Sequence, residues 1–476
     1  MKAPIFVLLL AGSLAAAVPT FNHDIAPILY QSCAECHRPG EVAPFSLLTY
    51  ADASKRASLI AAVTAKRYMP PWKAEPGYGH FADERRLTDQ QITLIGEWAR
   101  NGAPEGDPKQ RPELPKFASG WQAGHPDTVL TVPQSFAIPA DGRDVFQCFV
   151  VPMNATADEY VKTVEFHPGN TKVVHHALFF LDTTGEARKL DAATPEPGYP
   201  CFGGPQVEIA GGLGGWAPGA MPRPLPAGVA QAVKQGSDLI IQIHYHPSGK
   251  PELDQSSIGL TFTGKPEKGL AGMLAGSRKI DLAPGGAHQE VTDALTVPED
   301  VDLIGIAPHA HLLCKDMKVD AKLPGGKVEP LIWIKDWDFN WQGQYRYAEP
   351  VHLPKGTRIE MHYIYDNSAD NPHNPSNPPK RVTFGEQTTN EMALVFMQVV
   401  LPHPEDAPRF RQQMILSRLT QFLTEGGQPA GVTPRAMALI RAATARFDTN
   451  HNGTLEPEER AAMLKFLAAR FRQENR

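Results

Sequence analysis

The stretch Leu239-Ile240-Ile241-Gln242-Ile243-His244-Tyr245-His246 decides the fold class of the long middle part of the chain. Successive side chains of an extended strand point to opposite faces, so the odd-numbered residues share one apolar face. Gln242, His244 and His246 share the other face. Such an alternation is typical of a strand that packs its apolar side on a core. The alternative for the imidazoles is a hydrated rim at the strand end.

The same style of sequence extends over residues 121–402, where short alternating runs are broken by Gly, Pro, Asn and Asp. The whole chain of 476 residues contains 45 prolines and 40 glycines, which favours many turns and short strands. We expect strands at 144–151, 160–166 and 172–181. The pattern predicts two β-sandwich (jelly-roll) domains, at 121–275 and 276–403.

The pair His175-His176 lies within the expected strand 172–181. Adjacent strand residues normally face opposite ways, so a metal shared by both imidazoles would require a local bulge. Without one, a core histidine beside an exposed one is the simpler interpretation.

His309-Ala310-His311 places two imidazoles on one face of an extended segment, which is half of a metal site. An incidental surface pair is the alternative. Met392 follows Thr389-Asn390-Glu391 near the end of another expected strand. A thioether beside two imidazoles favours copper over zinc or iron. The aromatic residues from Trp333 to Trp341 are expected in the core or in a cleft wall.

A His-His pair, a His in Gln-x-His-Tyr, a His-x-His and a Glu-Met follow one another in this chain. In this order they resemble the copper type II ascorbate-dependent monooxygenases, which include peptidylglycine α-hydroxylating monooxygenase and dopamine β-monooxygenase. The resemblance covers about 145–400. It implies two copper ions, an electron-transfer copper held by His175, His176 and His244, and an O2-binding copper held by His309, His311 and Met392.

Two positions depart from the peptide-amidating members. Ala307 stands where those members carry an arginine that binds the substrate carboxylate, and Phe396 stands where they carry a tyrosine. A peptidylglycine substrate is therefore not expected. Cys148 and Cys201 both fall in the first copper half and could form a disulfide bond. Cys314 has no expected disulfide partner. It is either a buried residue that packs in the core or a thiol with a redox or metal-linked role.

A haem-binding segment precedes the copper halves, at 18–108. Cys33-Ala34-Glu35-Cys36-His37 is the attachment signature of c-type haem, with a redox disulfide or half a zinc site as alternatives. Met69 is the candidate second axial ligand and His80 its competitor. The stripe over 88–100 predicts a helix that Gly102 ends. The segment resembles small bacterial cytochromes c and predicts a small all-α domain, followed by a Pro-rich linker at 109–120.

The C-terminal segment, 404–476, is predicted to be helical and contains an EF-hand loop at 448–459. The expected calcium ligands are the side chains or carbonyl of Asp448, Asn450, Asn452, Thr454 and Glu459. An acidic surface loop is the alternative. With a single evident hand, a structural calcium is favoured over a sensor.

Residues 1–17 are expected to be a secretory signal peptide, with Lys2, an apolar run and small residues before a cut after Ala17. An uncleaved anchor is the alternative. Export implies a periplasmic or secreted protein in which cysteines can pair. No other run is long enough to span a bilayer, and a net charge of -6 argues against nucleic acid as a partner.

Together these observations predict an exported copper-dependent monooxygenase that hydroxylates a C–H bond of a small organic substrate with O2. Its electrons would come from an external donor, an ascorbate-like reductant or a redox protein, through the fused haem. A non-enzymatic copper/haem electron-transfer or copper-carrying protein is the second hypothesis. A partner in quinol or alcohol oxidation that uses the haem alone is the third.

Overall fold

The computed structural model describes residues 18–474, except 42, 119, 426–441 and 451–454. The expected signal peptide therefore lies outside the described residues. The chain divides into two compact units, the first made of 1–72 and 85–117 and the second of 73–84 and 118–476. Within the described part, no helix combines the length and the apolar character that crossing a bilayer requires.

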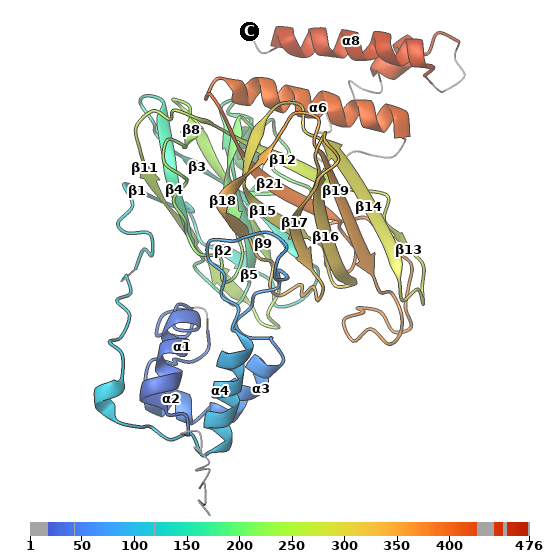
Figure 1. The fold of residues 1–476 in the computed structure, drawn as a ribbon. Coiled ribbons are helices and arrows are strands. Elements are labelled where there is room, and N and C mark those ends of the chain that lie inside the picture. The colour runs from blue at the N-terminus through green and yellow to red at the C-terminus, as the bar shows by residue number, and fades with distance from the viewer. Residues whose placement is uncertain (1–17, 42, 119, 426–441, 451–454, 475–476) are drawn as a thin grey trace, which may run out of the picture. The chain divides into compact units, whose positions relative to one another are not determined.

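The first unit contains only short helices, joined by irregular segments (Figure 1). Its elements are a π-helical turn η1 (Phe21–Ile25), α1 (Ala26–Ser32), α2 (Tyr50–Ser54), α3 (Ala57–Ala65), α4 (Asp89–Arg100) and a 3-10 turn η2 (Pro108–Gln110). The predicted helix over 88–100 is confirmed as α4. Thr88 caps it through a capping box with Gln91, and Gly102 follows its end with a φ of 81°.

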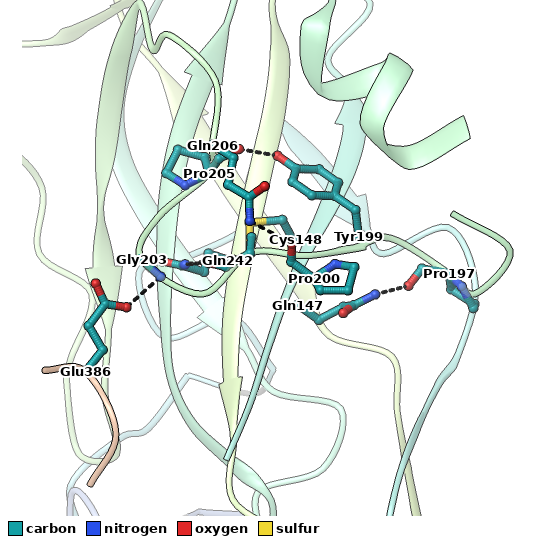
Figure 2. The surroundings of a disulfide bond; sticks show 11 residues. Gln147, Cys148, Pro197, Tyr199, Pro200, Gly203, Pro205, Gln206, Gln242 and Glu386 are labelled. Atoms are coloured by element: carbon teal, nitrogen blue, oxygen red, sulfur yellow. Dashed lines mark hydrogen bonds between the residues drawn. A yellow bond between two sulfur atoms is a disulfide. The ribbon is translucent and has the colours of Figure 1, made fainter. Parts of the chain in front are cut away.

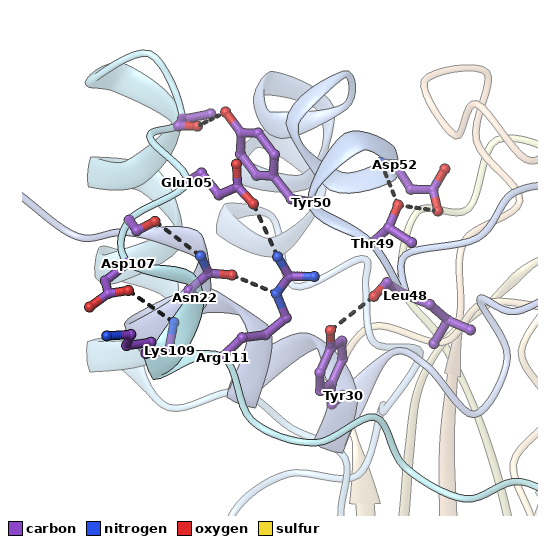
Figure 3. Close-up of polar contacts among 12 residues, drawn as sticks. Asn22, Tyr30, Leu48, Thr49, Tyr50, Asp52, Glu105, Asp107, Lys109 and Arg111 are labelled. Carbon is purple, nitrogen blue, oxygen red and sulfur yellow. Dashed lines mark hydrogen bonds and ion pairs between the residues drawn. The ribbon is translucent and has the colours of Figure 1, made fainter.

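The core of the first unit forms where α4 meets the start of the chain. Ile95 and Trp98 of α4 are fully buried, and the centroid of the Trp98 ring lies 6.2 Å from that of the Phe21 ring. Polar contacts then tie the segment after α4 back to the first turn (Figure 3). Arg111 donates to Asn22 Oδ1 at 2.8 Å, and Asn22 donates to the Gly106 carbonyl at 3.1 Å.

The first half of the second unit consists of two sheets that share one apolar core. One sheet has the strand order β6-β3-β9-β5-β7, and the other has the order β1-β11-β4-β8. The bounds in the first sheet are β3 (Val145–Pro152), β5 (Val174–Asp182), β6 (Tyr199–Pro200), β7 (Gly211–Trp216) and β9 (Asp238–Tyr245). Those in the second sheet are β1 (Thr128–Thr131), β4 (Glu159–His167), β8 (Gln231–Val233) and β11 (Ser257–Phe262). The strands expected at 144–151, 160–166 and 172–181 are confirmed as β3, β4 and β5.

The second half also has two larger sheets. Their orders are β12-β21-β15-β18 and β14-β19-β16-β17. The bounds are β12 (Gly269–Gly276), β14 (Gln289–Thr296), β15 (Val301–His309), β16 (Cys314–Lys322), β17 (Val328–Ile334), β18 (Tyr345–Leu353), β19 (Arg358–Tyr365) and β21 (Leu394–Leu401). Two-stranded sheets, β10-β2 and β13-β20, complete the second unit; they consist of β2 (Phe136–Ile138), β10 (Glu252–Asp254), β13 (Asp281–Leu282) and β20 (Val382–Thr383).

Helices also accompany the sheets, among them α5 (Glu186–Ala192), α6 (Asp406–Glu425) and α8 (Pro457–Glu474). Arg418 of α6 is buried and donates to the Gly276 and Ala294 carbonyls and to Asp293. The helix is thereby fixed to the edge of the second half.

The predicted fold class is wrong as stated. The structure is mostly β, with 33% of residues in strands and 19% in helices, and no distinct small all-α cytochrome domain is evident among the described residues. The described sheets number six, not the four of two simple sandwiches. The reason lies partly in 73–84, which the sequence assigns to the helical segment. That stretch instead forms bridges with β17 and β18, at Ala74–Ile334 and Phe81–Tyr347.

Cys148 and Cys201 form a disulfide bond between β3 and the loop that follows β6 (Figure 2). Gln242 of the neighbouring β9 donates to the Cys201 carbonyl at 2.8 Å. The bond therefore fixes the loop that begins at Cys201 to the central strands of its sheet. Cys314 is a buried free thiol.

Replacing both Cys148 and Cys201 with alanine should lower the free energy of unfolding by about 4 kcal/mol, because the bond closes a loop with a sequence separation of 53. Urea unfolding of oxidised protein measures the change. Wild-type protein unfolded in a reductant is the control and should show a similar loss. A loss below about 1 kcal/mol would contradict a structural role for this disulfide.

Candidate functional site

Three histidines of the first half form the first cluster: His175 and His176 on β5 and His244 on the adjacent β9. The pairing of β5 with β9 shifts register between Val174 and His176, which is the local irregularity that a shared site requires. The adjacent imidazoles can therefore point to one place. The predicted apolar face of β9 is also confirmed, since Leu239, Ile241, Ile243 and Tyr245 belong to the core of the first half.

The Nδ1 atoms of the first cluster converge. His176 Nδ1 lies 3.2 Å from His175 Nδ1 and 3.4 Å from His244 Nδ1. One ligand atom from each of the three residues lies within 4.8 Å of the other two. Three convergent ring nitrogens are a ligand set that a transition-metal ion can use.

Two neighbours hold the His244 ring. Phe146 of β3 stacks on it, with the ring centroids 4.2 Å apart and the planes 10° apart. Asp144 Oδ2 lies 3.2 Å from His244 Nε2, at ion-pair distance although outside good hydrogen-bond geometry. The other Asp144 oxygen accepts from His246 Nδ1 at 2.8 Å. A carboxylate behind the ring nitrogen that faces away from the metal is a common arrangement at metal sites.

Burial sets the charge state of these rings. Burial, reinforced by the nearby His244, lowers the pKa of His175 to about 3 and that of His176 well below its ordinary value. Burial alone would raise the pKa of Asp144, but the nearby His244 ring and hydrogen bonds from Thr388 and His246 outweigh it and lower that pKa. The His175 and His176 rings are therefore neutral at pH 7 and free of proton competition for a metal.

His309 and His311 come from the end of β15 and the turn after it, and with Met392 we call them the second cluster. The two rings lie 5.3 Å apart between centroids, nearly perpendicular at 83°. His309 Nδ1 donates to Gln342 Oε1 at 2.6 Å, and His311 Nδ1 donates to the Asn390 carbonyl at 3.1 Å. Because both Nδ1 atoms carry the proton, both Nε2 atoms keep the lone pair that a metal needs.

The second cluster is also neutral. Burial lowers the pKa of His309 to about 4, although the bond with Gln342 acts the other way. Burial and the neighbouring His309 lower the pKa of His311 to about 3. Both rings are therefore available as neutral ligands at pH 7.

Glu391 is a buried carboxylate that the sequence did not single out. It accepts from the backbone N–H of His311 at 2.8 Å, of Leu313 at 2.6 Å and of Met392 at 3.1 Å. Burial raises its pKa to about 8, even though these donors act in the opposite direction. Tyr365 donates to the Met392 carbonyl at 2.6 Å. Glu391 thus fixes the backbone on both sides of the second cluster.

All five histidines and Met392 line one cavity of about 2560 Å³. Phe339 lies between the clusters, with its ring centroid 5.1 Å from that of His175 and 5.6 Å from that of His311. The structure therefore brings the residues of the two predicted copper sites to the same cavity.

The haem-attachment residues lie at the end of α1, in the first unit. Cys33 and Cys36 are free thiols, and burial raises the pKa of Cys33 to about 12. His37 Nδ1 donates to the Phe45 carbonyl at 3.1 Å, which leaves Nε2 for an iron. Met69 belongs to the same unit, whereas His80 belongs to the second unit.

The predicted calcium loop is described only in part. Asn452 and Thr454 lie outside the described residues, so the ligand set stays a prediction. Glu459 Oε1 accepts from the Thr449 N–H at 2.8 Å, and Glu459 Oε2 accepts from the Glu456 N–H at 3.1 Å. The side chain expected in the last ligand position therefore reaches back to the start of the loop, next to Asp448.

Metal-free protein should lose stability as the pH falls from about 6.5 towards 4. The reason is that the histidines have a lower pKa in the folded state, so the unfolded state binds more protons in this range. His309→Gln removes one ring whose pKa is about 4 and should make this loss shallower, by up to about 1.4 kcal/mol per pH unit. Urea unfolding at several pH values measures the slope. His288→Gln at an exposed position is the control, and equal slopes in His309→Gln and wild type would contradict the assignment.

Comparisons with known proteins do not identify a family. No family model and no curated protein matches the chain. Among solved structures, the major capsid protein P2 from bacteriophage PM2 is similar with 8% identity and a TM-score of 0.26, over 58% of this chain and 97% of that one. PNGF-II matches with 10% identity and a TM-score of 0.23, over 58% and 65% of the two chains. Infectious bursal disease virus VP2 matches with 8% identity and a TM-score of 0.17, over 62% and 76%. These likenesses are too slight to carry a functional conclusion.

Proposed function

We propose that this chain is an exported copper-dependent monooxygenase that hydroxylates a C–H bond of a small organic substrate with O2. The observation that carries the proposal is the pair of histidine clusters on one cavity, in which burial lowers the pKa of His175 and His309. The resemblance of the ordered histidine and methionine motifs to the copper type II ascorbate-dependent monooxygenases supports the same conclusion.

The donor atoms of both clusters fit copper. Three imidazoles converge in the first cluster, and the second offers two imidazoles and the Met392 thioether at the wall of the same cavity. Imidazole suits several transition metals, but a thioether favours Cu(I). When bound, copper supplies one-electron redox chemistry and the activation of O2.

The stoichiometry of hydroxylation explains the need for two clusters. Converting R–H and O2 to R–OH and water consumes two electrons and two protons from outside the substrate. Two one-electron sites that face one cavity can store both electrons in a single protein. In this chain, Gln342 and the Asn390 carbonyl orient the second pair of rings, and Phe339 separates the clusters.

The wall beside His309 indicates what part of a substrate can lie there. Ala307 and Phe396 are partners in the pairing of β15 with β21, and both line the cavity. Leu274 of β12 continues this row as the partner of Phe396. The row carries no charge, so an apolar part of the substrate would face the second cluster, and a carboxylate would find no cation at Ala307.

We further propose that the first unit carries one covalently attached c-type haem. Cys33 and Cys36 would form the thioether bonds, and His37 Nε2 and Met69 would be the axial ligands. Electrons from an external donor would enter through this group. A calcium ion in the 448–459 loop would serve a structural purpose.

Metal analysis tests the copper assignment. Wild-type protein should bind two coppers per chain, and Met392→Ala should weaken binding at the second cluster by about 10- to 100-fold. The first cluster should be unaffected, because none of its ligands changes. Met221→Ala, at a half-buried methionine of the same cavity, is the control. Fewer than two coppers in the wild type would overturn the proposal.

Single-turnover kinetics test the role of the haem. Pre-reduced, copper-loaded wild type should reoxidise its haem when O2 is added, as followed by absorbance. His309→Ala should slow this reaction by about 100-fold or more, because O2 activation is lost at the second cluster. The same protein without copper is the control. A haem that stays reduced with both O2 and copper present would contradict the relay.

A further inference from the structure

The loop of residues 384–392, between β20 and β21, contacts both halves of the second unit. Glu386 accepts from the Gly203 N–H at 2.6 Å, beside the disulfide of the first half (Figure 2). Thr388 donates its hydroxyl to Asp144, which also belongs to the first half. The same loop ends at Met392 of the second cluster. One short segment therefore reaches both proposed metal sites.

On the side of the first cluster, the contact is a buried carboxylate. The Asp144 side chain is only 7% exposed. One of its oxygens faces His244 Nε2 and accepts from Thr388, and the other accepts from His246. Because Nδ1 of His244 points into the cluster, Asp144 fixes the direction in which that lone pair points.

On the side of the second cluster, three successive residues of the loop take part. The Asn390 carbonyl accepts from His311 Nδ1, and the Glu391 carboxylate accepts from the His311 and Met392 N–H groups. Met392 supplies the thioether. A shift of the loop would therefore change the ring orientation of His311 and the place of the sulfur together.

We propose that Asp144 is a positioning residue for the first cluster and that its bond with Thr388 makes the 384–392 loop a shared support of both clusters. Copper in one cluster then favours copper binding in the other. The inference rests on the proposed function, because it requires two copper sites. It adds a coupling between them that acts through protein contacts and not through the cavity.

This arrangement makes the effect of each cluster on the copper affinity of the other reciprocal. If copper at the first cluster fixes His244, Asp144 and Thr388, the loop loses fewer conformations when the second cluster binds. Coupling free energies of this kind typically change an affinity by about 5- to 150-fold. The loop contacts Asp144 through a single hydroxyl, so one substitution can remove this contact and leave the one between Glu386 and the Gly203 N–H in place.

Copper(I) titrations against a coloured competing chelator test the coupling in the full chain. The titrations compare wild type with Thr388→Val and with a control, Thr389→Val, at the exposed neighbouring threonine. Each of the three is measured with both clusters intact and again with one cluster removed. His309→Ala leaves only the first cluster functional, and His175→Ala leaves only the second. Thr388→Val should weaken the second cluster by at least about 5-fold when both clusters are intact. In the His175→Ala background it should add little further loss.

Further variants separate positioning from simple stabilisation. Thr388→Ser keeps the hydroxyl and should restore wild-type affinities. Asp144→Asn should weaken the first cluster by about 10- to 100-fold and change the electron paramagnetic resonance spectrum of its Cu(II), even if Thr388→Val fails to fold. A merely structural link would lower the melting temperature of Thr388→Val and leave both copper dissociation constants unchanged. If the wild type binds two coppers, that result overturns the coupling and leaves the proposed function standing. If the wild type binds fewer than two coppers, both the coupling and the proposed function are overturned.

Discussion

Five imidazole rings line one cavity, two of them buried and three half-buried, and their nitrogens need partners there. An imidazole taken out of water without a partner costs free energy, and a charged one costs far more. The chain meets this constraint by lowering the pKa of His175, His176, His309 and His311, by placing an acceptor behind His309 and His311, and by placing the Asp144 carboxylate 3.2 Å from His244 Nε2. The nitrogens that remain in the first cluster converge on one another at 3.2 and 3.4 Å. Such a set of ring nitrogens is suited to hold a cation with affinity for nitrogen.

The elements that provide these acceptors come from distant parts of the chain, and this explains the architecture of the second unit. Gln342 comes from the segment between β17 and β18, Asn390 from the loop before β21, and Asp144 from the residue before β3. The loop 384–392 is attached to the first half through Gly203 and Asp144. The halves are thus joined by polar contacts next to the two clusters, and also by a small apolar cluster in which Val229 of the first half packs with Ile304 and Val400 of the second.

The sequence revealed the histidines themselves, because spacing and alternation follow from the strand period of two. It also showed that His175 and His176 would need a bulge, which the pairing of β5 with β9 contains. It could not reveal Gln342, Glu391 or Asp144 as partners, since each acts across a long sequence separation that no local pattern encodes. Phe339 was expected in the core or in a cleft wall, and its place between the clusters depends on how the two halves meet. The prediction of an all-α domain was wrong for a related reason. Residues 73–84 form bridges with β17 and β18 and therefore belong to the β-rich unit.

The central claim is that two copper sites with different ligands face one cavity. X-ray absorption spectroscopy of the Cu(I)-loaded protein tests it most directly. The account predicts scattering from imidazole nitrogens at both coppers and from one thioether sulfur at one of them, with the sulfur contribution lost in Met392→Ala. A spectrum that contains no sulfur scatterer in the wild type, or one that Met392→Ala leaves unchanged, would contradict it.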